Sequence, residues 1–144
     1  MKKLIFTLAI VVSSLCSFAK DEDVNLVVLK SFQKEFAGVK DVQWTSAGDN
    51  FKASFVFNNQ YVFAFFTAGG ELMGVTRNMT SLELPVTLQA SLKKDYSEFW
   101  ISNLFEISNS DGTHYYITLE KADSKVILSS SDAEWKVYKK ASKI

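Results

Sequence analysis

Residues 51–73 read FKASFVFNNQYVFAFFTAGGELM, and this stretch decides the fold. Two runs of alternating aromatic and smaller residues are separated by Asn58-Asn59, and Gly69-Gly70 follows the second run. A two-residue hairpin turn needs positive φ at both positions, and asparagine tolerates that region better than any residue except glycine. The stretch therefore predicts a pair of β-hairpins, with turns at Asn58-Asn59 and at Gly69-Gly70.

The first turn also predicts which side chains share a face of the hairpin, because successive residues of a strand point to opposite sides. One face would carry the residues that we expect in the core: Phe51, Ala53, Phe55, Val62, Ala64 and Phe66. The opposite face would carry Tyr61, Phe63 and Phe65, across from Val56, Ser54 and Lys52. Three aromatic side chains in a row on a solvent face are uncommon on a monomer. We therefore take Tyr61, Phe63 and Phe65 as candidate binding residues.

The chain begins with a segment typical of a secretory signal peptide. Lys2 and Lys3 give a basic start and an apolar run covers residues 4–12, and Ser17 and Ala19 supply small side chains at the minus-three and minus-one positions of a cleavage site. A membrane-spanning helix needs about twenty apolar residues, so this run is too short for one. We expect residues 1–19 to be removed and the protein to be periplasmic or secreted, without stable membrane insertion.

Cys16 raises the alternative of a lipoprotein, in which a cysteine becomes the first residue of the mature chain. The preceding residue is Leu15, where that processing requires a small side chain, so cleavage after Ala19 fits better. The remaining residues 20–144 would form a single domain without any cysteine. Removal of Lys2 and Lys3 leaves 14 basic against 16 acidic residues, a formal net charge of −2. This near-neutral balance predicts no nucleic-acid partner.

The remainder of the chain repeats a helix followed by strands. Apolar residues at helical spacing predict a helix from Val24 to Phe36, with Asp23 as its cap, and a second helix after Leu84-Pro85. A strand is expected over residues 39–44 before the aromatic stretch, and further strands over residues 99–107, 115–119, 125–128 and 134–138. The units cover about residues 24–77 and 81–140. They predict an α+β fold in which two helix-plus-antiparallel-strand repeats form one continuous sheet with both helices on one face. The hairpin register and the helical spacing predict one core beneath both helices that includes Phe55, Phe66, Leu88 and Leu92, and Ser81 is expected to cap the second helix.

The order of these motifs resembles that of a known family. The motifs are Phe32-x-x-x-Phe36 leading into Val39-x-x-Val42-x-Trp44, the pairs Ala53-x-Phe55 and Ala64-x-Phe66 closing on Gly69-Gly70, and Leu84-Pro85-x-x-Leu88-x-x-x-Leu92-x-x-x-Tyr96 leading into Phe99-x-Ile101. Together they look like the secreted PepSY-like proteins that are related in fold to the β-lactamase inhibitory protein. The chain departs from that pattern at Ala37, where the family usually has proline. The resemblance implies an inhibitor-like fold outside the cytoplasm, without enzymatic activity.

Catalytic and metal chemistry find little support in the predicted mature chain. It has no cysteine and a single histidine, His114, so no nucleophile–base pair or zinc ligand set can be assembled from the sequence. Asp49-Asn50 and the segment 109–112 lack the ligand spacing of a calcium loop and are better explained as turns. We therefore predict no catalytic residue, no metal and no cofactor.

Two classes of function remain. The first is a non-enzymatic module that binds an unidentified protein, or a second copy of itself, through the open face of the sheet. Tyr116 and Thr118 of the second unit would extend the face formed by Tyr61, Phe63 and Phe65. The alternative is a carrier of a small apolar ligand with a groove between sheet and helices. Coverage of the open face by the segment with Trp135 and Tyr138 would argue against the first class.

Overall fold

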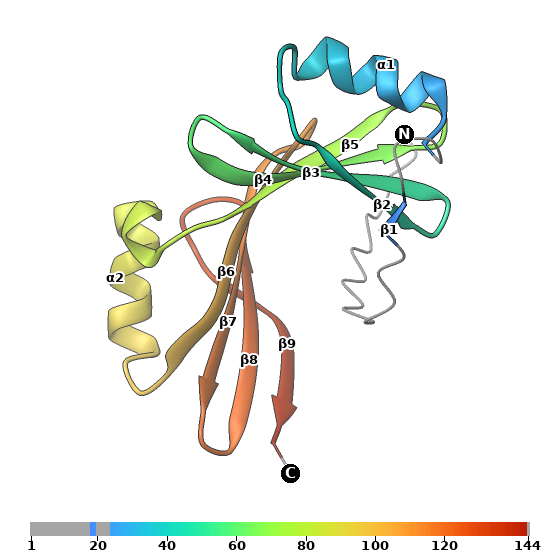
Figure 1. Cartoon of the computed structure of the whole chain (residues 1–144). Helices are drawn as coiled ribbons and strands as arrows, with labels where there is room; N and C mark the ends of the chain where they lie inside the picture. Colours follow the sequence, from blue (N-terminus) through green and yellow to red (C-terminus); the bar gives the residue numbers. More distant parts are fainter. Residues whose placement is uncertain (1–17, 20–23, 144) are drawn as a thin grey trace.

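The computed structural model describes residues 18–19 and 24–143 of the chain (Figure 1). The helices of this part are α1 Leu26–Glu35, the short 3-10 helix η2 Ser81–Glu83 and α2 Val86–Asp95. Its strands are β1 Phe18–Ala19, β2 Gln43–Ala47, β3 Asn50–Phe57, β4 Gln60–Thr67, β5 Leu72–Asn78, β6 Trp100–Asn109, β7 Gly112–Lys121, β8 Ser124–Ser130 and β9 Lys136–Ser142. Each strand pairs antiparallel with the next along the chain, so that one sheet forms in the order β1 to β9.

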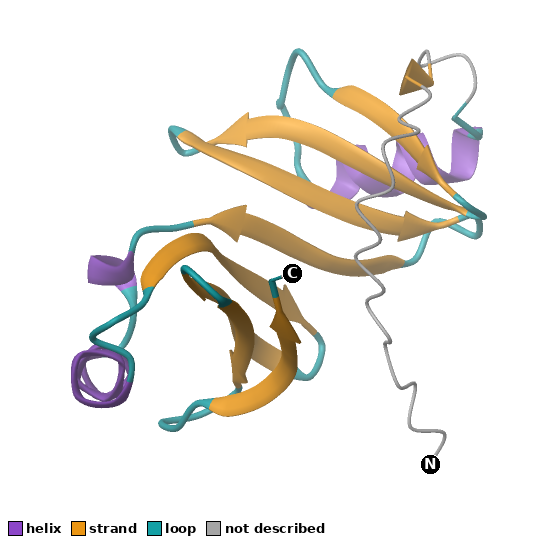
Figure 2. Ribbon diagram, turned by 90° about the horizontal axis from the view of Figure 1, so that it is seen from below, coloured by secondary structure: helices purple, strands orange, loops and turns teal. Residues whose placement is uncertain are grey.

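Both α-helices lie on the same face of this sheet. Figure 1 shows α1 along β2–β5 and α2 beside β6–β8, and Figure 2 shows the strands of the first unit in front of α1. The strands of the first unit run across those of the second in Figure 1, as the normal twist of a long sheet requires. The predicted α+β class, with two helix-plus-strand units on one continuous sheet and both helices on one face, is confirmed.

The predicted register of the central hairpin is also confirmed. Asn58 and Asn59 have φ angles of 49° and 61°, and the pairs across the hairpin include Phe55 with Val62 and Ala53 with Ala64. The backbone geometry of these two asparagines thus sets the faces of β3 and β4. At the next turn only Gly70, with a φ of 85°, needs the left-handed region. A Cβ there would lie 2.7 Å from side-chain atoms of α1, so the turn also approaches the helix closely.

Helix α1 is fixed over the first unit by its cap. The side chain of Asn25 accepts a hydrogen bond from the Val28 N–H at 2.9 Å and donates one to the Ala68 carbonyl at 2.8 Å. One residue therefore satisfies an unpaired helix N–H and ties the helix to the β4–β5 turn. We predicted Asp23 as the cap; Asp23 lies outside the described residues, and the observed cap is Asn25.

The core is divided into two clusters, one under each helix. Under α1 the cluster consists of Val24, Val28, Phe32, Trp44, Ala53, Phe55, Val62, Ala64 and Phe66. Under α2 it consists of Leu84, Leu88, Leu104, Ile117, Leu119, Val126 and Leu128. The sequence pattern led us to expect one shared core for Phe55, Phe66, Leu88 and Leu92. That expectation is wrong, because the twist of the sheet separates the two helices and each buries its own set.

Two local predictions need correction. The expected strand over residues 39–44 begins only at Gln43, because positive φ angles at Gly38 and Asp41 interrupt the extended backbone before it. Ser81 was expected as a helix cap, but Thr80 caps η2, with the Glu83 carboxylate accepting from the Thr80 N–H. Of the predicted signal peptide, the structure describes only Phe18–Ala19, which form β1 and pair antiparallel with β2.

Candidate binding face

The strand register places the predicted binding residues together on the side of the sheet away from the helices, which we call the open face. Phe63 pairs with Ser54 and Thr76, and Tyr116 pairs with Phe105 and Ser129. Residues directly opposite one another in neighbouring strands share a face. The pairs Thr76 with Ile107 and Ile107 with His114 therefore connect the two units across this face.

The first unit contributes an aromatic group around Phe63. Tyr61 is 53% exposed, whereas Phe63 and Phe65 are half-buried. The rings of Tyr61 and Phe63 meet edge to face with centroids 5.3 Å apart, and the Lys52 ammonium lies 5.3 Å from the centroid of Phe63. Ser54, across from Phe63, is 7% exposed. The rings are thus not fully free in solvent, and no other element of the described residues covers them; they pack against one another and shield the strand beneath.

The second unit contributes a second aromatic group around Tyr116. Its ring stacks on Phe105, with centroids 5.4 Å apart and an interplanar angle of 12°, and meets Tyr138 edge to face at 5.5 Å. Tyr116 and Thr118 are half-buried, and Tyr138 is 51% exposed. Burial raises the pKa of the Tyr116 hydroxyl, and the neighbouring Tyr138 hydroxyl raises it further.

The sequence interpretation missed three residues of this face. Phe105 and Ile107 alternate with polar or inward neighbours along β6, and this alternation was the available signal. Ile107 is 6% exposed and yet belongs to neither core cluster, so it is buried from the open side. Tyr138 was named from the sequence only as part of a segment that would cover this face; Val137 pairs with the inward Leu128, so alternation along β9 places Tyr138 on the open face.

The C-terminal segment divides between the two faces. The Trp135 indole N–H donates to the Leu88 carbonyl at 3.1 Å, and Trp135 packs with the cluster under α2. Of Trp135 and Tyr138, only Tyr138 lies on the open face. Coverage of the face by Trp135 and Tyr138 together was the alternative to an available surface, and Trp135 is on the other side of the sheet.

An ion network on the helix side joins the two units. The Arg77 guanidinium on β5 contacts Glu106 on β6 at 3.0 Å and Glu83 on η2 at 2.9 Å. Hydrogen bonds from the Thr80 backbone and from Arg77 lower the pKa of Glu83. The hydrogen bond to Glu106 is the main cause of a raised pKa at Arg77. This network holds η2, and with it the start of α2, against the middle of the sheet.

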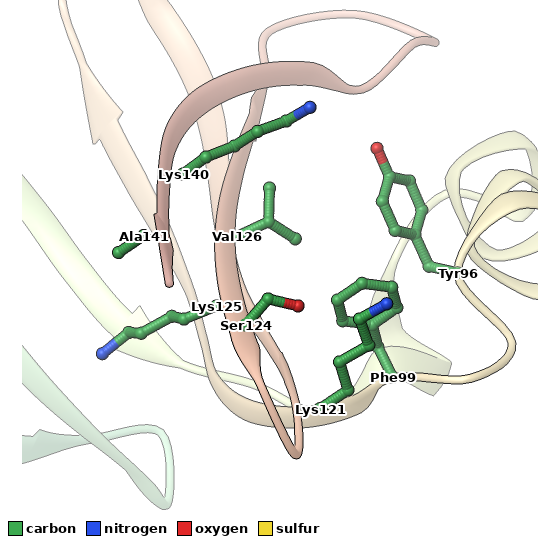
Figure 3. Close-up of a pocket in the computed structure, with 8 residues that line it drawn as sticks. All are labelled: Tyr96, Phe99, Lys121, Ser124, Lys125, Val126, Lys140 and Ala141. Atoms are coloured by element: carbon green, nitrogen blue, oxygen red, sulfur yellow. The ribbon is translucent and has the colours of Figure 1, made fainter. Parts of the chain in front are cut away.

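A small cavity lies on the helix side of the second unit (Figure 3). It has a volume of about 220 Å³ and is lined by Tyr96, Phe99, Lys121, Ser124, Lys125, Val126, Lys140 and Ala141. Figure 3 shows the Tyr96 hydroxyl and the Lys140 side chain on opposite sides of the opening, with Lys121 beside Phe99. The Lys121 ammonium is 5.3 Å from the Phe99 centroid. Lys125 points away from the opening in Figure 3, but Lys121, Lys140 and the modest volume distinguish the cavity from a typical site for a wholly apolar ligand, which measures about 300–1,000 Å³.

The described residues offer little for metal or acid–base chemistry. In residues 18–19 and 24–143, no three histidine, cysteine, aspartate or glutamate side chains gather as a metal site would require. His114 is half-buried near the start of β7 on the open face, across from Ile107. No helix in the described part is long and apolar enough to cross a membrane.

An antiparallel open sheet with two helices on one face defines a class of two-layer α+β folds in which the second face of the sheet carries no helix. The similar solved structures are of this kind. A BLIP-like protein from Bacteroides fragilis matches with a TM-score of 0.70 and 14% identity over 82% of this chain and 85% of that one. A DUF2874 family protein from Bacteroides uniformis matches with a TM-score of 0.72 and 13% identity over 82% and 88%.

A third similar structure is described as a candidate periplasmic protein from Bacteroides eggerthii. Its TM-score is 0.70, and the 16% identical match covers 83% of this chain and 88% of that chain. No protein-family model matches the sequence, and no curated protein does. At these identities the likeness establishes the fold, and the fold is BLIP-like. The PepSY-like assignment made from the sequence motifs stays a prediction.

Proposed function

We propose that this chain is a non-enzymatic, extracytoplasmic binding module, an inhibitor of or accessory to an envelope protein or protease, and that it binds through its open face. The observation that supports this proposal most is the position of the two aromatic groups. They lie on the face away from both helices, where the fold needs no apolar side chains. Large aromatic residues that are partly exposed and held by their neighbours are typical anchors of protein interfaces.

The location rests on the predicted signal peptide and on the fold. Residues 1–19 have the basic, apolar and small-residue parts of an export signal. The absence of cysteine from residue 20 onward suits an oxidising compartment without dependence on disulfides. One structural neighbour is itself described as a candidate periplasmic protein, which agrees with this location.

The available binding energy is smaller than full exposure of the rings would give. Complete burial of a phenylalanine is worth about 1.5–3 kcal/mol, but Phe63 and Phe65 are already half-buried in the free protein. Each would add about 1 kcal/mol on binding, and Tyr61 would add somewhat more because half of it is exposed. Several such contacts together, with the rings already fixed in place, are sufficient for a specific interface.

The test compares two double variants. Phe63→Ser with Phe65→Ser changes the centre of the first aromatic group. The matched control is Leu82→Ser with Val86→Ser, two apolar side chains that are 82% and 79% exposed beside the start of α2. We expect the first variant to lose capture of its partner from the envelope fraction and any self-association in sedimentation, while the control retains them. Equal capture by both variants would contradict the proposal.

Because Phe63 and Phe65 also shield the sheet, their double variant could unfold. Tyr61→Ser, at a side chain that is 53% exposed, reports on binding without that risk. Urea denaturation of all three variants separates loss of fold from loss of binding. A folded Tyr61→Ser variant with unchanged partner capture would count against the first aromatic group as an anchor.

The second candidate function is a carrier of a small ligand, and the cavity beside α2 is the observation that favours it. Its volume of about 220 Å³ admits only a small molecule or a single side chain, and its lysines favour an anionic group over a wholly apolar one. Co-purified small molecules, measured by mass spectrometry after denaturation of the exported protein, would favour this function if Val126→Trp removed them.

A further inference from the structure

The strands of the sheet carry few acidic residues. In the described strands only two carboxylates occur, Glu106 on the helix side and Glu120 on the open face. Glu106 is already paired with Arg77. The other acidic residues of residues 24–143 lie in helices, turns and connecting loops. The open face is thus almost free of negative charge.

Lysines are more numerous on the open face than on the helix side of the strands, where Lys121 and Lys140 line the small cavity. Lys136 pairs with Ser129 and Lys139 with Ile127, which share the face of Tyr116 and Thr118. Lys125 pairs with Glu120 across β7 and β8. Lys143 reaches the same side, because its ammonium lies 3.8 Å from Glu120 and 4.8 Å from the centroid of the Trp100 ring.

Lys52 adds a fifth cation beside the first aromatic group. Five lysines against one glutamate give the open face a formal charge of +4, although the chain from Lys20 onward has a net charge of −2. Protection of a sheet edge explains lysines on β9, but it does not explain Lys52 on the interior strand β3 or Lys125 on β8. The positive charge is therefore a property of the open face and is not limited to the edge strand.

We propose that the open face takes an acidic polypeptide, in which aspartate or glutamate residues flank an apolar or aromatic side chain. This inference rests on the proposed function and adds the chemistry of the partner. The apolar side chain would contact the exposed ring of Tyr61, and the carboxylates would pair with Lys52 at one end and Lys136 and Lys139 at the other. Opposite charges placed around an apolar centre provide specificity and rapid association.

The geometry favours a polypeptide over a nucleic acid or a membrane. The Tyr116 ring is stacked on Phe105 and contacts Tyr138, so little of its face remains free for a base. The strands of the two units run across one another, so the open face is twisted and cannot lie flat on a bilayer with both aromatic groups in contact (Figure 1). A protruding loop or strand can follow such a surface.

The experiment selects disulfide-closed peptide loops of random sequence, displayed on phage, against the whole exported protein. We expect the selected loops to be enriched in aspartate and glutamate around an apolar residue, and to bind about tenfold more weakly when NaCl is raised from about 50 to about 300 mM. The variant Lys125→Glu, Lys136→Glu, Lys139→Glu should lose these loops by at least about tenfold and select loops rich in lysine and arginine instead.

The control changes the net charge equally but elsewhere. Lys30→Glu, Lys34→Glu and Lys93→Glu lie on exposed positions of α1 and α2, and this variant should still select acidic loops. If both triple variants behave alike, the charge of the face plays no part and the inference is wrong.

The outcomes also separate this inference from the proposed function. If the selected loops are not enriched in acidic residues but fail to bind the Tyr61→Ser variant, the inference of an acidic partner is wrong. The proposal that the open face binds a partner would still stand. Loops unaffected by Tyr61→Ser and by the face lysines would overturn both. Tighter binding to vesicles of phosphatidylglycerol and phosphatidylcholine, or to a thymidine oligonucleotide, than to any selected loop would replace the polypeptide with that partner.

Discussion

Truncation of Phe55 to alanine tests the central hairpin register and the packing under α1 together. Phe55 is 1% exposed, and its ring contacts Phe32 with centroids 5.1 Å apart and Phe36 with centroids 4.8 Å apart. The lost transfer energy is about 2–3 kcal/mol, and the residual cavity and the two aromatic contacts bring the expected cost to about 3–5 kcal/mol. That is a large part of the stability of an ordinary domain, which is about 5–15 kcal/mol.

The matched control is Phe57→Ala, at a side chain two residues further along the same face of β3. Phe57 is 41% exposed and its nearest ring partner is Phe36 at 6.0 Å, so we expect a cost below about 1 kcal/mol. Both variants are measured by urea denaturation of the protein beginning at Lys20, with the slope of the transition as a check on two-state behaviour. A cost below about 1 kcal/mol for Phe55→Ala, or equal costs for the two variants, would refute the assigned faces.

Three further predictions concern the two clusters, the C-terminal segment and the ion network. Phe55→Ala and Leu88→Ala remove side chains from different clusters, so a double-mutant cycle should give a coupling energy below about 0.5 kcal/mol. Trp135→Phe removes the donor to the Leu88 carbonyl and should cost about 0.5–1.5 kcal/mol in urea denaturation. The lowered pKa of Glu83 means that its contribution is present above its ordinary value of 4.5 and is lost as the pH falls through the folded value. The stability difference between wild type and Glu83→Gln should therefore shrink on acidification, and a difference that grows instead would contradict the network.

The faces of β3 and β4 could be predicted from sequence because two local rules act there at once. Asn58 and Asn59 fix the turn, and period-two alternation then assigns every residue from Phe51 to Phe66 to a side. Neither rule needs information from distant parts of the chain. The same logic failed for β2, where Gly38 and Asp41 adopt positive φ and delay the strand to Gln43.

The second aromatic group was only partly predictable, because its assembly depends on strand irregularities. The register shifts between Ile101 and Asn103 on β6, and again between Ile127 and Leu128 opposite β9. Each shift exchanges the face of every residue beyond it, so alternation read along the sequence gives the wrong side past that point. Lys139 reaches the open face through the second of these shifts, whereas Tyr138 lies there by plain alternation from Val137, which faces the helix side with Leu128.

The positive charge of the open face could not be predicted from the net charge of the chain. Composition gives the chain from Lys20 onward a net charge of −2, and that average led to the expectation of no electrostatic footprint. Lys52 and Lys143 are 91 positions apart, and only the successive pairing of the seven strands β3 to β9 brings them to one face. Residues that pair directly across neighbouring strands share a face of the sheet. The face on which a lysine lies is therefore set by its pairing partner and not by its distance along the sequence. A nearly neutral sequence can thus produce a face of charge +4, and the chemistry of a partner is determined by that face and not by the average.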